Sequence, residues 1–166
     1  MLQDNHATEI AQILERYPQA SKRAAVMPLL FLAQREVGFI SRDAINEIAG
    51  LLDLDPTDVG SLIGYYTLFY DKPGGKYRIQ ICTDLPCALR GAEKFSHEVC
   101  EMLNIQVGET TEDGFFTLEE VMCLAACDRA PLFQVQGKGG IQYHENMTLE
   151  STTAFIESIR EQDANE

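Results

Sequence analysis

The segment YRIQICTDLPC, at residues 77–87, is the stretch from which the fold of this chain can be derived. Tyr77–Ile81 predicts a β-strand that ends at Cys82, and Ala88–Leu103 predicts the helix that follows it. Cys87 then lies just before this helix or at its start. Because a helix N-terminus carries free N–H groups and a partial positive charge, it stabilises a thiolate there.

The rest of the C-terminal part continues as strands and one more helix. We expect strands at Phe115–Val121, Leu132–Gln136 and Ile141–His144, a turn at Gly137–Gly140, and a last helix capped by Thr148. The helix after the first strand is a candidate for a right-handed crossover between strands. The order β-α-β-β-β-α predicts a mixed four-stranded sheet with helices against it, which is a thioredoxin-like arrangement.

The N-terminal part predicts four short amphipathic helices. Their expected starts are at Thr8, Ser21, Ser41 and Asp55-Pro56. Pro28 is expected to kink the second helix or to confine its first turn to a separate piece. The turn signal of residues 71–75 then marks a domain boundary. We therefore expect an α+β protein with a small helical bundle over residues 1–72, suited to partner docking, and a thioredoxin-like domain over residues 73–166.

Four of the five cysteines form two closely spaced pairs. Cys82 and Cys87 are separated by four residues, Cys123 and Cys127 by three, and 35 residues lie between the pairs. The start MLQDNHATEI has neither the basic nor the apolar region of an export signal, so we expect a cytoplasmic protein with reduced thiols. Paired cysteines at the ends of neighbouring strands then indicate a metal site at one edge of the sheet.

Three kinds of site are considered for these pairs. A structural zinc site tolerates the spacings but usually has shorter ones, and a disulfide oxidoreductase needs a C-x-x-C motif, which this chain lacks. A 2Fe–2S cluster is larger than one zinc ion and suits longer loops, so the spacing favours it slightly over zinc. A Rieske centre is disfavoured because His6, His97 and His144 share no metal-type spacing with the cysteines.

The flanks of the cysteines carry a more specific signal. The stretches AAVMPLLFLAQREVGFIS, DVGSLIGYYTLF, GKYRIQICTDLPC and GETTEDGFFTLEEVMCLAACDRAP resemble, in this order, the NuoE-type 2Fe–2S ferredoxin subunits of respiratory complex I. The resemblance covers nearly the whole chain and implies one 2Fe–2S cluster held by Cys82, Cys87, Cys123 and Cys127. The family often has glycine where this chain has Ala125, and a positive φ there would cost alanine roughly 1–2 kcal/mol.

The resemblance also implies a function. The chain is expected to be an electron carrier without a substrate site of its own, and an enzyme only as a subunit of NADH:quinone oxidoreductase. FMN and NADH would belong to a tightly associated NuoF-type flavoprotein subunit in the peripheral arm of complex I. The sequence leaves open the equivalent diaphorase subunit of an NAD-linked hydrogenase or formate dehydrogenase, and a zinc-stabilised binding module.

The charge of the chain argues against other classes of partner. A net charge of −13 disfavours nucleic acid and anionic membrane, and the longest apolar stretch, Ala24–Ala33, is too short to insert into a bilayer. Residues 73–166 hold 16 acidic and 7 basic side chains, against 10 and 6 in residues 1–72. Because acidic surroundings disfavour the addition of an electron, we expect a reduction potential on the order of −400 mV.

Three further features are expected to be structural. Cys100 lies in the middle of a predicted helix without a nearby partner, which is typical of a small apolar core residue. Thr83 is expected to be a turn residue. The aromatic side chains between positions 65 and 70 are expected to pack within the core, with a partner contact as the alternative.

Overall fold

The computed structural model describes residues 2–137 and 140–164, and the chain divides into two compact units, Met1–Pro73 and Gly74–Glu166. Each unit has its own apolar core and is described by itself. Among the described residues, no helix is both long enough and apolar enough to cross a membrane.

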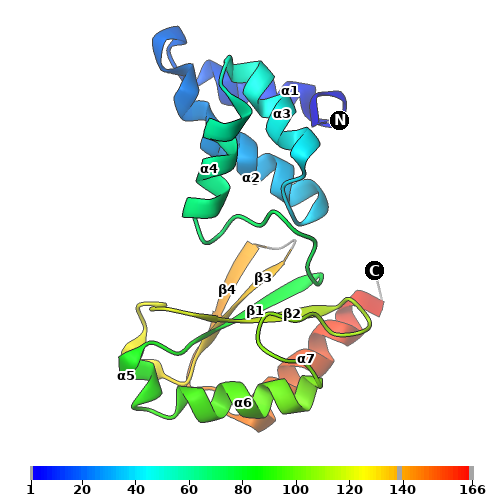
Figure 1. The fold of residues 1–166 in the computed structure, drawn as a ribbon. Coiled ribbons are helices and arrows are strands. Elements are labelled where there is room, and N and C mark those ends of the chain that lie inside the picture. Colours follow the sequence, from blue (N-terminus) through cyan, green and yellow to red (C-terminus); the bar gives the residue numbers. More distant parts are fainter. Residues whose placement is uncertain (1, 138–139, 165–166) are drawn as a thin grey trace. The chain divides into compact units, whose positions relative to one another are not determined.

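The first unit is helical, as the amphipathic pattern predicts (Figure 1). Its elements are α1 (Leu2–Glu15), the 3-10 helix η1 (Gln19–Ala25), α2 (Val26–Val37), α3 (Arg42–Leu52) and α4 (Pro56–Tyr65). Two starts are confirmed by their caps: the Ser41 hydroxyl accepts the N–H of Ala44 at 3.2 Å, and the Asp55 carboxylate accepts the N–H of Thr57 at 2.7 Å.

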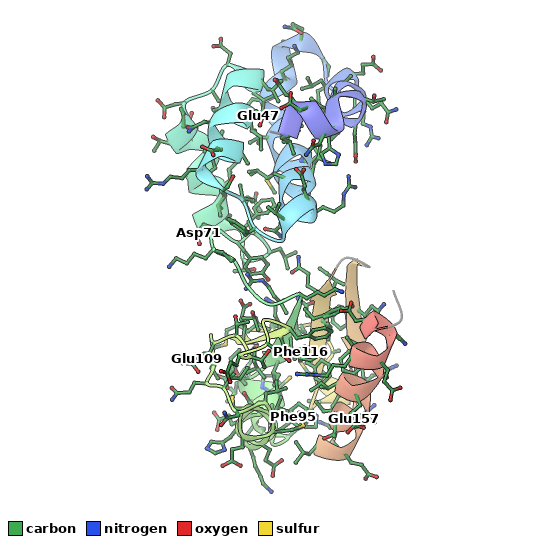
Figure 2. All side chains as sticks on the ribbon, turned by 90° about the vertical axis from the view of Figure 1, so that its right-hand side faces the viewer. Glu47, Asp71, Phe95, Glu109, Phe116 and Glu157 are labelled. Atoms are coloured by element: carbon green, nitrogen blue, oxygen red, sulfur yellow. The ribbon has the colours of Figure 1, made fainter. Side chains whose placement is uncertain are left out.

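The expected start of the first helix at Thr8 is wrong, because α1 already begins at Leu2. Glu47 of α3 caps it from a distant part of the chain by accepting the backbone N–H groups of Leu2, at 2.8 Å, and Gln3, at 2.6 Å. Figure 2 labels Glu47 in this unit. The kink in α1 lies at His6, where φ is −131° and ψ is 26°. A cap supplied by another helix leaves no signal in the local sequence.

The second predicted helix is in fact two elements. Ser21 lies inside η1, and α2 begins at Val26. Pro28 occupies the first turn of α2, where a missing N–H costs little because that group has no intrahelical partner. The second of the two expected effects of Pro28 is therefore confirmed: the start of the predicted helix is a separate element, η1.

The second unit is built around a mixed four-stranded sheet. Its elements are β1 (Tyr77–Cys82), α5 (Leu85–Ala88), α6 (Ala92–Leu103), β2 (Phe116–Val121), the 3-10 helix η2 (Cys127–Arg129), β3 (Phe133–Gly137), β4 (Gly140–His144) and α7 (Leu149–Ala164). The strand order is β2-β1-β3-β4, with β1 parallel to β2 and the other pairs antiparallel. Helices α6 and α7 lie against the sheet (Figure 1). This confirms the expected α+β architecture and the mixed sheet.

One helix of this unit differs from the expectation. The predicted helix over residues 88–103 is two helices, α5 and α6, because Gly91 has a left-handed φ of +90° between them. The break changes the direction of the chain, so Leu89, which would face inward in one continuous helix, is 81% exposed. In the predicted β3–β4 turn, Lys138 and Gly139 lie outside the described residues.

The core of the second unit lies between the sheet and its helices. Phe95 and Val99 of α6 are buried in one cluster with the inward residues of the strands, among them Ile79 and Phe116. Figure 2 labels Phe95 and Phe116 in this unit. Successive residues of a strand point to opposite faces, so Ile79 and Ile81 face this core while Cys82 belongs to the other set.

We predict that His144 makes the second unit acid-sensitive. Its ring lies 5.2 Å from that of Phe133 and 4.2 Å from that of Phe155, and within the described part of the chain its buried Nε2 has no hydrogen-bond partner. Burial lowers the pKa of His144, so the unfolded chain takes up a proton first. The second unit therefore has its full stability above pH 6.5, about the pKa of His144 in the unfolded chain. Stability is lost as the pH falls below this value, because the proton binds the unfolded chain more strongly.

The measurement is the thermal midpoint at about pH 7 and about pH 5. His144→Phe keeps the ring packing without the titrating group and should lose less stability on acidification than the unmodified chain. His97→Gln, which changes an exposed histidine of α6, is the control and should follow the unmodified chain. Equal acid sensitivity of all three proteins would contradict the assignment to His144.

Candidate metal centre

Parallel pairing of β1 and β2 brings the two cysteine loops to one end of the sheet. Cys82, the last residue of β1, is the register partner of Val121, the last residue of β2. Beyond them, the N–H of Thr83 donates to the carbonyl of Val121 at 3.1 Å. From the other side, the N–H of Cys82 donates to the carbonyl of Leu132 at 3.2 Å. Both ends of the second cysteine loop are therefore fixed beside Cys82.

Cys87 is positioned by the short helix α5. The carboxylate of Asp84 accepts the N–H of Leu85 at 2.9 Å, and the Asp84 carbonyl accepts the N–H of Cys87 at 2.8 Å. Cys87 thus lies inside its own helical turn, α5, whereas it was expected just before or at the start of one continuous helix; the longer helix α6 begins only at Ala92. Asp84 stabilises this turn as its N-cap.

The four paired cysteines lie at different depths. Cys82 and Cys87 are each 1% exposed and pack in a small apolar cluster with Ala92, Ala130 and Leu132. Cys127 is half-buried, and Cys123 is exposed. The inner pair is therefore shielded from water, while the second loop forms the outer boundary of the site.

Hydrogen bonds converge on the sulfur of Cys82. Burial by itself would raise the pKa of Cys82, but the backbone N–H groups of Leu124, Asp84 and Cys123, together with the Cys87 thiol, overcome this and lower the pKa. Three backbone donors aimed at one sulfur favour its negatively charged form. Two of these N–H groups, those of Cys123 and Leu124, belong to the second cysteine loop, so this loop influences the ionisation of Cys82.

Cys87 has the opposite preference. Burial, the hydrogen bond with Cys82 and the nearby charges of Cys82 and Cys127 raise the pKa of Cys87 to about 12. Like charges in a low-dielectric site repel one another, so the thiols cannot all ionise without a cation between them. A metal group with positive charge would remove this penalty, since it binds the thiolate form of each ligand.

The second loop adopts two left-handed residues. Cys123 has φ of +54° and Ala125 has φ of +58°. The sequence raised the question of whether position 125 needs a positive φ, and the structure shows that it does. This conformation turns the chain sharply in the loop whose N–H groups at Cys123 and Leu124 lower the pKa of Cys82.

The number and pairing of the thiols can be compared with what an iron–sulfur cluster needs. A 2Fe–2S cluster takes two thiolates on each iron and therefore needs two pairs of cysteines. Two adjoining loops with two thiols each, and backbone N–H donors directed at the sulfur, supply such a set.

The remaining residues considered from the sequence lie elsewhere or have structural roles. Cys100 packs at the edge of the second unit's core, where burial and the charge of Glu120 raise its pKa. Phe69 is buried in the first unit's core, whereas Tyr65 is 78% exposed, so the expectation of core packing is wrong for Tyr65. One contact that the sequence did not indicate is that of Arg90, whose Nε donates to the carbonyl of Ala130 at 3.3 Å and links both loops.

We predict that Ala125→Gly raises the free energy of unfolding by about 1 kcal/mol, because glycine adopts a positive φ without the clash that alanine suffers. Urea titration of the metal-free chain measures this. The matched control is Ala126→Gly, since Ala126 has φ of −129° and gains nothing from glycine. A destabilising effect of both substitutions would contradict strain at position 125.

Sequence comparison places this chain among known proteins. The family model described as "Thioredoxin-like [2Fe-2S] ferredoxin" matches residues 10–160. An E-type subunit of NADH-quinone oxidoreductase from Rhizobium meliloti is 39% identical over 152 residues, which cover 92% of this chain and 87% of that protein. The second subunit of NADH-quinone oxidoreductase from Thermus thermophilus is 36% identical over 153 residues, which cover 92% and 84%.

A solved structure agrees with this in fold. A chain in the crystal structure of NAD+-reducing [NiFe]-hydrogenase in the air-oxidised state matches with a TM-score of 0.67 and 21% identity, covering 81% of this chain and 23% of that one. At this identity the likeness shows the fold alone. By its sequence relatives and the family model, this chain belongs to the thioredoxin-like 2Fe–2S ferredoxin family.

Proposed function

We propose that this chain is a one-electron carrier within an NADH-oxidising enzyme complex, and that Cys82, Cys87, Cys123 and Cys127 hold its 2Fe–2S cluster. The observation that carries the proposal is the convergence of both cysteine loops at the ends of β1 and β2, with Cys82 beside Val121. The relatives named above are subunits of NADH-quinone oxidoreductase, which agrees with this role.

When bound, a 2Fe–2S cluster supplies one-electron oxidation and reduction at an otherwise redox-inert sheet edge. The residues of the chain exclude water from the site, stabilise negative charge on sulfur and provide access for electrons. Cys82 and Cys87 are buried and keep water from the inner side of the site. The N–H groups of Asp84, Cys123 and Leu124 donate to the Cys82 sulfur and stabilise negative charge on it. Cys123 is exposed, so the second loop is the side on which electrons enter or leave.

The surrounding charge sets the direction in which the potential is shifted. The C-terminal residues 73–166 carry 16 acidic and 7 basic side chains, which disfavour the addition of an electron. Hydrogen bonds to sulfur act in the opposite sense. We propose a low potential, on the order of −400 mV, which suits exchange with a reduced flavin.

We infer that the partner is the NADH-binding flavoprotein subunit of the complex, of the NuoF type, and that FMN and NADH bind there. The helical bundle of residues 1–72 is the proposed docking element, with Tyr65 and Phe31 as exposed aromatic side chains, 78% and 46% exposed. We place the complex at the cytoplasmic face of the membrane. The equivalent subunit of an NAD-linked hydrogenase has the same mechanism, and the partner enzyme distinguishes the two.

Replacement of each cysteine by serine should distinguish the cysteines that bind the cluster from the one that does not. We expect Cys82→Ser, Cys87→Ser, Cys123→Ser and Cys127→Ser to abolish or markedly change the EPR signal of the dithionite-reduced protein, because serine is a poor ligand for iron in such clusters. Cys100→Ser is the matched control and should leave the signal intact. A variant of the four that retained the unmodified signal would remove that cysteine from the ligand set.

Docking by the bundle is tested by deleting residues 1–72. We expect the shortened chain to keep its cluster, since Cys82 and Cys87 pack within the second unit, but to bind the flavoprotein at least about tenfold more weakly. Isothermal titration calorimetry measures the affinity, and visible absorbance checks the cluster. Unchanged affinity of a shortened chain with intact absorbance would contradict docking by the bundle.

A further inference from the structure

Six basic side chains lie within the described part of the second unit, and five of them are ion-paired with carboxylates. The pairs are Lys76 with Asp163, Arg78 with Glu119, Lys94 with Glu98, Arg129 with Glu145, and Arg160 with Asp113. The sixth is Arg90, and no carboxylate of the described residues lies at ion-pair distance from its guanidinium group. Arg90 therefore keeps an uncompensated positive charge in a unit that is otherwise strongly acidic.

Arg90 lies against both cysteine loops. Its backbone N–H donates to the carbonyl of Cys87 at 3.0 Å, and its side-chain Nε donates to the carbonyl of Ala130 at 3.3 Å. Ala130 is 4% exposed and belongs to the small apolar cluster that contains Cys82 and Cys87. A carbonyl oxygen fixes the guanidinium group in place but, unlike a carboxylate, does not cancel its charge. The positive charge is therefore held beside the cluster of side chains in which the two inner thiols lie.

The other charged side chains near the second loop do not supply a free positive charge. Arg129, two residues after Cys127, is paired with the carboxylate of Glu145 at 2.5 Å. Asp128, directly after Cys127, is 82% exposed and negative. Among the described residues, Arg90 is thus the cation whose charge remains uncompensated at this end of the sheet.

Such a charge acts on the redox equilibrium of the site. Four thiolates give a bound 2Fe–2S cluster a negative charge, and reduction adds one more electron without making or breaking a bond. A nearby cation stabilises the reduced form more than the oxidised form, because Coulomb energy is proportional to the charge on each partner. A guanidinium group suits this role since it stays protonated throughout the physiological pH range.

We propose that Arg90 raises the reduction potential of the site by supplying this uncompensated positive charge, and that its hydrogen bond to Ala130 holds the charge in place. The inference rests on the proposed function and deepens it, since it names the residue that opposes the acidic side chains of residues 73–166. Because Arg90 is exposed, water and salt screen its charge, and the expected effect is moderate.

The test is a dye-mediated redox titration of the full chain carrying its cluster, followed by visible absorbance, with EPR of the reduced protein as a check on the cluster. Arg90→Gln removes the charge, and Arg90→Lys keeps the charge but loses the Nε donor. Arg160→Gln is the matched control, because it removes the same charge from an arginine that lies 5.4 Å from the Phe115 ring. Phe115 directly precedes β2, whose other end leads into the second cysteine loop, so this control lies at the opposite end of the sheet.

We expect Arg90→Gln to lower the ratio of reduced to oxidised cluster about threefold at a fixed potential, which corresponds to about 30 mV at about 59 mV per tenfold change. Arg90→Lys should lie closer to the unmodified chain than to Arg90→Gln, and Arg160→Gln should match the unmodified chain. The effect of Arg90→Gln should shrink between about 0.1 M and about 1 M salt, because the Debye length falls from about 10 Å to about 3 Å. The line shape of the EPR signal should not change.

An unchanged ratio in Arg90→Gln would overturn the inference, as would equal lowering by Arg160→Gln or by Arg90→Lys. If Arg90→Gln loses its cluster, Arg90→Met, which keeps the apolar stem of the side chain, replaces it. Loss of the cluster from both neutral variants would also overturn the inference, because Arg90 would then be needed for the structure of the loops. An unmodified chain that takes up no electron from the reduced dyes would instead contradict the proposed function.

Discussion

The parallel pairing of β1 with β2 is the interaction on which the site depends. Parallel strands end at the same edge of a sheet, and here this places Cys82 beside Val121, so that both cysteine loops leave from neighbouring points. The crossover through α5 and α6 makes the pairing possible, and the apolar core between the sheet and α6 holds it. A shift of register would move Cys82 away from its donors on the second loop and separate the two cysteine pairs.

Much of this architecture could be predicted from the sequence because it depends on local patterns. Asp55 followed by Pro56 specifies a helix start, and the alternation of apolar and polar residues at Tyr77–Ile81 specifies a strand. The predictions fail where distant or conformational factors decide. Glu47 caps α1 from another helix, and Gly91 breaks a helix whose apolar pattern continues through it. Neither the capping by Glu47 nor the break at Gly91 changes the apolar periodicity from which helices are predicted.

The candidate site also has features that could be predicted from the sequence and features that could not. The spacing of the cysteines indicated a paired-thiol site, and the resemblance implied that all four are ligands. The structure brings the two cysteine loops to one end of the sheet. Which thiol has a lowered pKa could not be predicted, because it depends on local backbone conformation, including the left-handed residues Cys123 and Ala125 of the second loop. The exposure of Leu89 could not be predicted either, because its side chain would face inward if the helix over residues 88–103 were continuous.

The identity of the metal group decides whether this chain can carry electrons, and elemental analysis tests it directly. Protein purified without oxygen and without added metal should contain two iron ions and two acid-labile sulfide ions per chain. It should also be brown and keep this colour through gel filtration. A colourless protein with about one zinc per chain and no acid-labile sulfide would contradict electron transfer, because the same cysteines would then serve a structural ion without redox chemistry.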